Sequence, residues 1–250
     1  MAKILTFIAE KGGTSRSSVI FSTSWELAKQ GRKILIIDMD GQSANISYYS
    51  GINVSYDTLT IVDIFRGKPI TDTIKNIKDN LDIIPANSDL TNLGQNAKLS
   101  ELKKSLKTVK DNYDYIFIDV NPTPGWTHFL SLSVSDGTVI VSLPDVACLK
   151  ANEGILETIE EIREGSNPNL KVIGLLFGKN ESRTSMSKQV HDVADVMMNR
   201  ANSSVFETSI RNAVVMGELV AFHQGVTDYA PSAPVAGDIR EFASELERKS

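Results

Sequence analysis

The chain has 250 residues, enough for a full hydrophobic core, and its hydrophobic (41%) and charged (23%) fractions are those of a globular protein. Its net charge of −5 excludes a surface built throughout for nucleic acid or an anionic membrane, so such a contact needs a local basic patch. The one cysteine, Cys148, excludes an intrachain disulfide, and without a secretory signal pattern or an apolar run of ~18 residues we expect a single cytoplasmic domain over residues 1–250.

Apolar strand segments alternate with helical segments along the chain. This alternation predicts an α/β fold, with a mostly parallel, twisted sheet of about seven or eight strands and helices on both faces. Residues 41–80 are expected to form an insertion at the rim of the sheet. The expected strands are 3–9, 33–38, 81–84, 113–119, 137–143, 171–177 and 204–207. The expected helices are 17–30, 98–110, 126–134, 149–165, 185–199, 212–221 and 236–248.

The first strand runs into a glycine-containing loop and then a helix, over residues 10–18. Gly12 and Gly13 permit a tight bend, and Ser17 and Ser18 are suited to cap the helix. Backbone N–H groups at such a bend, together with the helix dipole, favour a polyphosphate. Because ligands of α/β sheets bind at the carboxyl ends of the strands, we expect a nucleotide here.

The loop departs from the standard phosphate-binding sequence G-x-x-x-x-G-K-[ST]. Glu10 and Ser15 stand at its two glycine positions, and Arg16 stands at its lysine position. The same residues that indicate a nucleotide therefore argue against ordinary hydrolysis.

Carboxylates end two further strands. Asp38 and Asp40 follow the second strand, and Asp119 ends the strand 113–119. Carboxylates beside phosphates are stable when Mg²⁺ offsets the repulsion, and Asp119 has the position of a Walker B acid. Taken alone, the first pair also fits a polar turn and Asp119 also fits a turn cap. Their joint occurrence with the loop favours a nucleotide–magnesium site.

These segments resemble the ParA/MinD family of deviant-Walker P-loop ATPases, and most closely its ParA-type partition ATPases. The family loop K-G-G-x-G-K-[ST]-[ST] appears at residues 11–18, D-x-D-P-Q at 38–42, and Y-D-x-I-x-I-D-x-P-P at 113–122. Residues 210–212 are similar to the family's I-P-R-N without its proline. The resemblance spans nearly the whole chain.

The resemblance implies an ATP–Mg²⁺ sandwich homodimer. Lys11 would reach the partner's phosphates, and Asp40 would position the attacking water, with Arg16 at the remaining catalytic position. The loop would hold ATP through Lys11, Gly12, Gly13, Thr14, Ser15, Arg16, Ser17 and Ser18. The metal would be held by Ser17, Asp40 and Asp119, and the adenine would lie against Asn180 and Arg211.

Arg16 and Ser15 lead us to expect that ATP binding survives while hydrolysis is weak or depends on a partner. A guanidinium keeps the charge of the lysine but is larger and planar, and a misplacement of ~1 Å can cost ~100-fold in rate. Ser15 places a Cβ where glycine permits a positive φ. The alternative is a non-hydrolysing, nucleotide-dependent regulatory or adaptor protein.

The resemblance also implies partners in DNA segregation, such as that of a plasmid: a ParB-like centromere-binding protein and DNA bound without sequence preference. Lys103, Lys107 and Lys110 share one helix face, and Lys179, Arg183 and Lys188 form a looser cluster. Either group fits an ordinary solvated surface as well as a DNA contact. The last helix carries several glutamates among its polar residues, so we expect it to pack on the sheet and not to bind a membrane.

Overall fold

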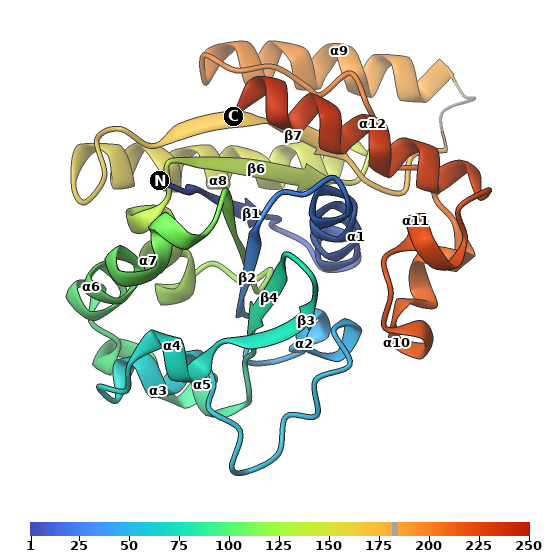
Figure 1. The fold of residues 1–250 in the computed structure, drawn as a ribbon. Helices are drawn as coiled ribbons and strands as arrows, with labels where there is room; N and C mark the ends of the chain where they lie inside the picture. Colours follow the sequence, from blue (N-terminus) through green and yellow to red (C-terminus); the bar gives the residue numbers. More distant parts are fainter. Residues whose placement is uncertain (182–184) are drawn as a thin grey trace.

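The computed structural model describes residues 1–181 and 185–250 (Figure 1). Within this part of the chain, seven strands form one sheet in the order β3-β4-β2-β5-β1-β6-β7. All neighbouring strands are parallel except β3 and β4, which confirms the predicted α/β fold. The strands are β1 (Lys3–Ile8), β2 (Ile34–Met39), β3 (Lys75–Lys78), β4 (Leu81–Ile84), β5 (Tyr115–Val120), β6 (Gly137–Ser142) and β7 (Lys171–Phe177).

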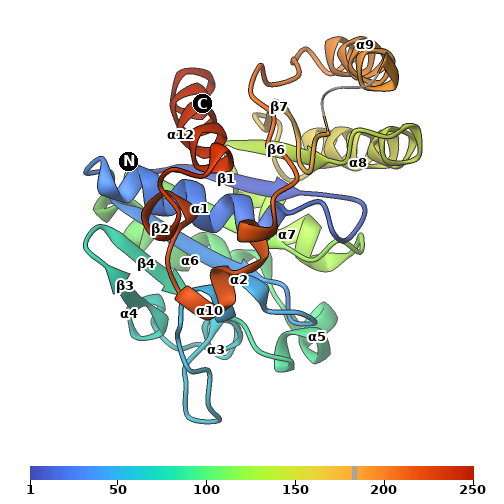
Figure 2. The same cartoon turned by 90° about the vertical axis from the view of Figure 1, so that its right-hand side faces the viewer.

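Helices cover both faces of the sheet, as Figures 1 and 2 show. One face carries α1 (Arg16–Lys29), α2 (Asn45–Tyr49), α10 (Leu219–Phe222), α11 (Val226–Tyr229) and α12 (Pro234–Lys249). The other carries α3 (Ile61–Phe65), α4 (Ile70–Thr73), α5 (Asp89–Leu93), α6 (Leu99–Val109), α7 (Trp126–Val134), α8 (Val146–Glu164) and α9 (Ser185–Arg200).

The central strands are buried on both faces, so their sequences are almost continuously apolar. Phe7 of β1 and Phe117 of β5 point to the α1 and α12 side, where their ring centroids lie 5.2 Å apart. Ile116 and Ile118 point to the opposite side. The side chains thus alternate between two cores, and this alternation fixes the strand register.

Two segments differ from the sequence-based expectation. Residues 75–78 form β3, an edge strand that was not predicted because its sequence Lys-Asn-Ile-Lys lacks an apolar run. Asn80, with φ of 64°, closes the antiparallel turn between β3 and β4. Residues 204–207 do not form a strand, since Val205 makes only an isolated bridge to Leu175.

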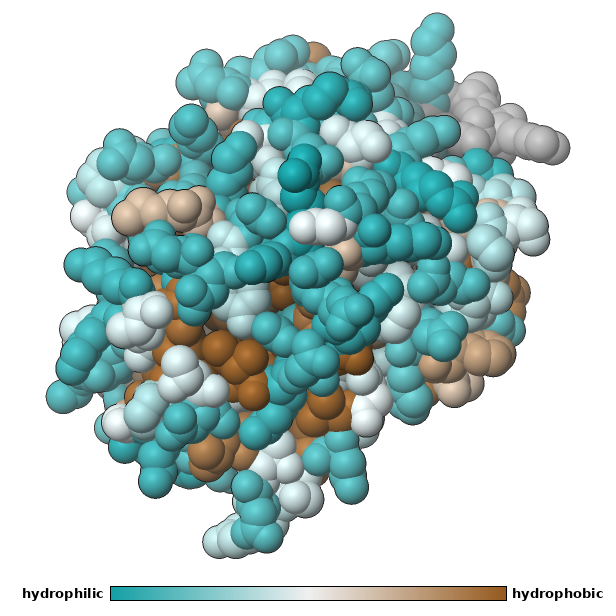
Figure 3. Space-filling view, viewed as in Figure 1, coloured by the Kyte–Doolittle hydropathy of each residue, from teal (hydrophilic) through white to brown (hydrophobic). Residues whose placement is uncertain are grey.

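The last helix packs on the sheet, as predicted. Ile239, Phe242 and Leu246 of α12 are fully buried against the core that contains α1. Glu245 is also buried, and its carboxylate accepts the backbone N–H groups of Glu207 and Thr208, each at 2.9 Å. The visible surface over α12 is mostly hydrophilic (Figure 3). Among the described residues, no helix combines the length and apolarity needed to cross a membrane.

The C-terminal segment is fastened to α1 by one tryptophan. Trp25 donates its indole N–H to Asp228 of α11 at 2.8 Å, and Lys29 binds the other oxygen of that carboxylate at 2.7 Å. The Lys78 ammonium lies 4.3 Å from the centre of the Trp25 ring. Gly225 packs so tightly on Trp25 that a Cβ at this position would collide with the indole. These contacts join α1, β3 and α11.

Candidate functional site

The loop after β1 bends through two residues of left-handed conformation. Gly13 has φ of 81°, which is natural for glycine, but Ser15 has φ of 67°, which costs a side chain about 1–2 kcal/mol. Ser15 is the N-cap of α1 and its hydroxyl caps no N–H group, so the expectation that Ser17 and Ser18 cap the helix was wrong. The helix begins one residue earlier than expected, at Arg16, and its first turn lacks a side-chain cap.

A neighbouring glycine allows this loop to lie close to β7. A Cβ at Gly178, directly after β7, would collide with the backbone carbonyl of Thr14. The chain at residue 178 therefore supports the loop from the side, and only glycine fits there without a shift of the backbone. Sequence reasoning missed this contact, because nothing local to Gly178 identifies its neighbour.

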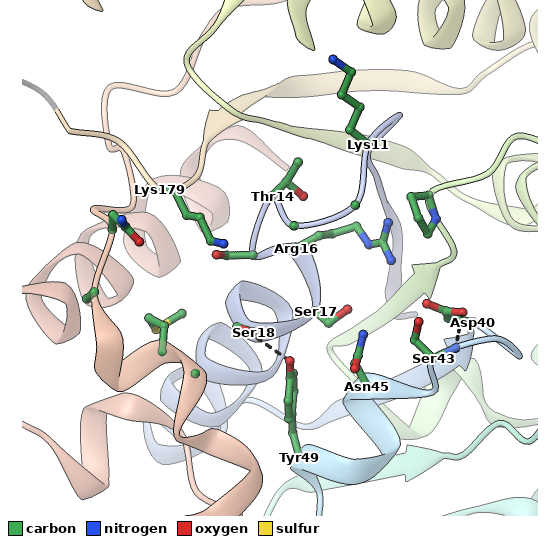
Figure 4. A pocket seen from close by; sticks show the side chains of 18 of the residues that line it. Lys11, Thr14, Arg16, Ser17, Ser18, Asp40, Ser43, Asn45, Tyr49 and Lys179 are labelled. Carbon is green, nitrogen blue, oxygen red and sulfur yellow. Dashed lines mark hydrogen bonds between the residues drawn. The ribbon is translucent and has the colours of Figure 1, made fainter.

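The loop opens into a pocket of about 480 Å³. The pocket lies at the carboxyl end of the sheet, where the loop after β1, the segment after β2 and the residues after β7 converge (Figure 4). Of the predicted nucleotide-binding and catalytic residues, it is lined by Lys11, Gly12, Gly13, Thr14, Ser15, Arg16, Ser17, Ser18, Asp40 and Arg211. Asp119 lies next to this lining through its contact with Arg16, whereas Asn180 does not line the pocket, although its neighbour Lys179 does.

Arg16 is buried, with 6% of its surface exposed, and it is paired with the acid at the end of β5. Its Nε donates to Oδ1 of Asp119 at 2.5 Å. The two residues are 103 positions apart in the chain, so no local pattern indicates the pair. Arg16, which stands at the lysine position of the standard loop, thus contacts Asp119, the carboxylate that we expected to bind magnesium.

Asp119 retains one carboxylate oxygen without a hydrogen-bond partner among the described residues. This Oδ2 atom is buried, and burial raises the pKa of Asp119 while the charge of Arg16 opposes the rise. The same charge adds to burial in lowering the pKa of His128, on α7, to about 4. His128 is therefore neutral at pH 7 and leaves Arg16 as the cation that faces Asp119.

Asp38 is a second buried acid beside Asp119. The two residues are partners in the register of β2 and β5. Asp38 accepts hydrogen bonds from the Ser47 hydroxyl at 2.6 Å, the Ser47 N–H at 3.2 Å and the Asp40 N–H at 2.9 Å. Burial, followed by the charge of Asp119, raises the pKa of Asp38 to about 8. Asp38 therefore holds the segment after β2 in place, by accepting the backbone N–H groups of Asp40 and Ser47.

Asp40 points into the pocket and is fixed by its own turn. Its Oδ1 accepts the N–H groups of Gln42 and Ser43, each at 3.0 Å, and the residue is 2% exposed (Figure 4). This geometry holds one carboxylate oxygen against the backbone. The other oxygen remains available for a ligand of the pocket.

The residues present fit a magnesium ion whose shell is completed by a nucleotide. In the described ranges, no three His, Cys, Asp or Glu side chains gather into a metal centre. Mg²⁺ usually needs only one or two carboxylates when phosphates and waters supply its other ligands. Ser17 Oγ, Asp40 and the unpartnered Oδ2 of Asp119 offer such oxygens. Arg16, however, already holds Oδ1 of Asp119.

The opposite end of the pocket is built around Arg211. Its Nε and Nη2 donate to the two oxygens of Asp238, each at 2.7 Å, and its backbone N–H donates to the same carboxylate at 3.0 Å. Asn180 forms an isolated backbone bridge with Arg211, and its side-chain N–H donates to Ser209 at 2.9 Å. The Asn180 Oδ1 atom is buried and has no partner within the described part of the chain.

Lys11 is the exposed cation of the loop, whereas Arg16 is buried. Its side chain projects away from Arg16 and Asp40 (Figure 4). The pocket also has lining residues that sequence reasoning did not assign to the site. These residues are Ser43, Asn45, Tyr49, Pro122, Lys179, Asn212, Ala213, Val214, Met216 and Gly217. Pro122 and Asn212 belong to the motif segments 113–122 and 210–212, and Lys179 precedes Asn180. The others lie in residues 43–49 and 213–217, which carry no motif and reach the pocket only through the path of the chain.

The predicted lysine face lies at the other edge of the sheet. Lys103 and Lys107 of α6 are exposed, while Leu102 and Leu106 are buried beneath them. With Lys110, Lys3 and Lys171, these two lysines line a groove of about 900 Å³ at the amino ends of β1, β6 and β7. Of the looser cluster, Lys179 lines the first pocket, and Arg183 lies outside the described residues.

Known proteins resemble this chain in sequence, and solved structures resemble it in fold. The family model AAA_31, described as an AAA domain, matches residues 2–172. The chromosome-partitioning ATPase Soj of Thermus thermophilus is 26% identical, covering 95% of this chain and 92% of its own. McdA from Cyanothece has a similar fold, with a TM-score of 0.87, 17% identity and coverage of 98% and 100%. MinD from Pyrococcus horikoshii, complexed with Mg-ADP, has a TM-score of 0.81, 21% identity and coverage of 99% and 97%.

Proposed function

Because this chain belongs to the ParA/MinD family of P-loop ATPases, we propose that it binds ATP with Mg²⁺ in the pocket beside Arg16. One observation carries the proposal: α1 begins at a glycine-containing loop, and none of the described side chains caps its first turn. The N–H groups of that turn can therefore bind phosphate oxygens, and the helix dipole adds to the attraction. The Mg-ADP bound to Pyrococcus horikoshii MinD supports this class of ligand.

Ser17 and Asp40 would hold the metal together with phosphate oxygens. When bound, the ion offsets the negative charge that grows on the phosphates during transfer. Asp40 would also orient the attacking water with its available oxygen, since the backbone N–H groups of Gln42 and Ser43 fix the other one. Asn180 does not line the pocket before a nucleotide binds, but its buried Oδ1, which has no partner among the described residues, would be an acceptor suited to the exocyclic amine of adenine, beside the wall that Arg211 forms.

Hydrolysis would be slow. The cation that normally stabilises the transferred phosphoryl group is replaced by Arg16, whose Nε is committed to Asp119. The test compares ATP affinity by calorimetry and turnover by phosphate release for the native chain and the Ser15→Gly/Arg16→Lys double variant. We expect native binding in the micromolar range, on the order of that of other nucleotide enzymes, and turnover at least about tenfold lower than that of the double variant. Native turnover equal to or above the variant's would contradict the proposal.

ATP binding would bring two copies of the chain together. Lys11 supports this step because it is exposed and projects away from its own phosphate loop, toward where a second molecule could offer a nucleotide. Light scattering after size exclusion, with and without ATP, measures the assembly. The Lys11→Ala variant should remain monomeric at ATP concentrations that dimerise the native chain. Lys104→Ala, an exposed lysine on α6, serves as the matched control and should dimerise normally.

The dimer would serve DNA partition, as the name of the Thermus thermophilus relative states for that protein. We propose a ParB-like partner and DNA contact through the groove that contains Lys103, Lys107 and Lys110. A phosphate-driven contact weakens steeply with salt. Fluorescence anisotropy with duplex DNA at low salt should show binding that Lys103→Glu/Lys107→Glu reduces at least about tenfold. Unchanged binding by this variant would remove the groove from the proposal.

A second function, that of a non-hydrolysing regulatory or adaptor protein, is favoured by the buried contact between Arg16 and Asp119. If the contact persists with ATP bound, the nucleotide would act as a structural ligand that sets the assembly state. Turnover below detection with DNA and partner present, together with ATP-dependent dimerisation, would select this function. Stimulation of turnover by either partner would select the partition ATPase.

A further inference from the structure

Within the described part of the chain, Arg16 uses only one of its donor nitrogens. Its Nε binds Asp119, while Nη1 and Nη2 make no hydrogen bond to any described residue. Arg16 is nevertheless buried and lines the pocket (Figure 4). The four remaining N–H donors of its guanidinium therefore lie in the space where phosphates are proposed to bind.

This arrangement places one cation between a carboxylate and a phosphate site. A guanidinium is a planar fork whose donors match phosphate oxygens in pairs, so Nη1 and Nη2 can bind a phosphate while Nε stays on Asp119. In standard P-loop ATPases the link from the strand-end acid to the phosphates runs through Mg²⁺. A lysine at residue 16 would make this link less well, because its ammonium is a point charge on a flexible stem without a rigid fork of paired donors.

The charge of the site points the same way. Arg16 offsets the buried carboxylate of Asp119, so that acid no longer repels an incoming phosphate. His128, which is buried on α7 next to this pair, is neutral and adds no positive charge. Lys11, the other cation of the loop, is exposed and projects away. Lys179 also lines the pocket but is exposed, so Arg16 is the buried cation that offsets Asp119.

We propose that Arg16 takes over the link between Asp119 and the phosphates, so that this pocket binds nucleoside triphosphate with nearly the same affinity without a divalent cation. The inference rests on the proposed ATP site. It adds that this site also binds the nucleotide without a bound metal ion. Mg²⁺ remains necessary for turnover, through Ser17 and Asp40. Binding and hydrolysis would therefore have different metal requirements.

The test measures ATP binding by calorimetry to the intact chain, in excess MgCl₂ and in excess EDTA. We expect the native Kd to change less than about threefold between the two buffers, because Arg16 supplies the charge-assisted hydrogen bonds in both. Arg16→Lys should bind at least about tenfold more weakly in EDTA than in MgCl₂, because it lacks the fork. Arg66→Lys, a change in an exposed ion pair with Asp89, is the matched control and should behave like the native chain.

The outcomes separate this inference from the proposed function. Native binding that requires MgCl₂, with a loss of about thirtyfold or more in EDTA, would overturn the role of Arg16 and leave the ATP site standing. No binding in either buffer would overturn the ATP site itself. An Arg16→Lys variant as insensitive to EDTA as the native chain would also overturn the inference, and thermal melts of each variant show that the comparison is made on folded protein.

Discussion

The two ends of the pocket each hold an arginine paired with an aspartate, and the pairs differ in burial and in the nitrogens they use. Arg16 is buried and gives a single Nε–H to Asp119. Arg211 is half-exposed and gives Nε and Nη2 to both oxygens of Asp238. Arg16 keeps Nη1 and Nη2 available for a ligand, whereas Arg211 uses Nε and Nη2 to bind Asp238.

This difference shows that the role of each arginine depends on which of its nitrogens already bind a protein carboxylate, more than on the residue type. A buried pair is costly to break because it leaves an uncompensated charge, while an exposed pair is screened by water. We therefore regard the Arg16 pair as part of the ligand-binding chemistry. The Arg211 pair acts as a brace that fixes the segment after β7 to α12.

Among the variants that test this comparison, Arg16→Ala is expected to change the free energy of unfolding most. Removal of the guanidinium leaves Asp119 buried and unpaired, which should lower the free energy of unfolding by about 3–5 kcal/mol. Urea denaturation at pH 7 measures it. Adding Asp119→Ala should recover part of the loss, because the unpaired charge is then gone. A loss below about 1 kcal/mol for Arg16→Ala would show that the two pairs are energetically alike.

The next largest effect on stability is expected from Asp38, a third acid, which lies beside Asp119 at the Arg16 end of the pocket. The pKa of Asp38 is raised to about 8, so the folded chain holds a proton that the unfolded chain has already released. Stability should consequently fall by about 1–2 kcal/mol as pH rises from 6.5 to 8. Asp38→Asn should flatten this fall, as measured by urea denaturation across the range. His128 acts in the opposite sense but only below about pH 6.5, because its pKa is lowered.

The failure of Asp38→Asn to change the slope would place the proton elsewhere. Asp119 is another buried acid of this end, and burial also raises its pKa, so it is the natural second variant to titrate. The end of the pocket around Arg211 offers the contrast, since its buried acid, Asp238, is paired with Nε and Nη2 of Arg211.

A smaller effect is expected for Arg211→Ala. Its guanidinium is half-exposed, and although Asp238 is buried, the backbone N–H of residue 211 still donates to that carboxylate in the variant, so the free energy of unfolding should fall by only about 1 kcal/mol. The same urea experiment measures it, next to Arg16→Ala. A loss as large as that of Arg16→Ala would mean that exposure does not distinguish the two ends of the pocket.

The smallest effect, and an increase, is expected for Ser15→Gly. Ser15 lies in the left-handed region and glycine relieves that strain, so stability should rise by about 0.5 kcal/mol after the entropic cost of glycine in the unfolded chain. Gly13→Ser, at φ of 81°, is the mirror experiment and should lower stability. A destabilising Ser15→Gly would show that the serine hydroxyl contributes contacts that outweigh its strain.

Much of the fold could be predicted because its signals are local. Continuous apolar runs identified the six parallel strands of the described sheet, and glycine and strand-end carboxylates identified the loops that meet at the pocket. The edge strand β3 escaped because an exposed strand needs no apolar run. Residues 204–207 have the composition of a strand, but the short segment makes one isolated bridge at Val205.

The contacts inside the site could not be predicted. Sequence placed Arg16 and Asp119 in one site, but only the side-chain directions show that Nε meets Oδ1. The brace between Arg211 and Asp238 joins residues 27 positions apart across a loop and a helix. Such pairs depend on rotamers and on the register of elements far apart in the chain, which local patterns do not encode.

The attachment of α11 to α1 gives the molecule a built-in optical label. The indole of Trp25 has a carboxylate at its N–H and an ammonium over its ring, and both charges belong to segments other than its own helix. The fluorescence of Trp25 should change in wavelength and intensity when the segment that contains α11 moves relative to α1. With Trp126 replaced by phenylalanine, a stopped-flow fluorimeter could follow that motion in real time without any added dye.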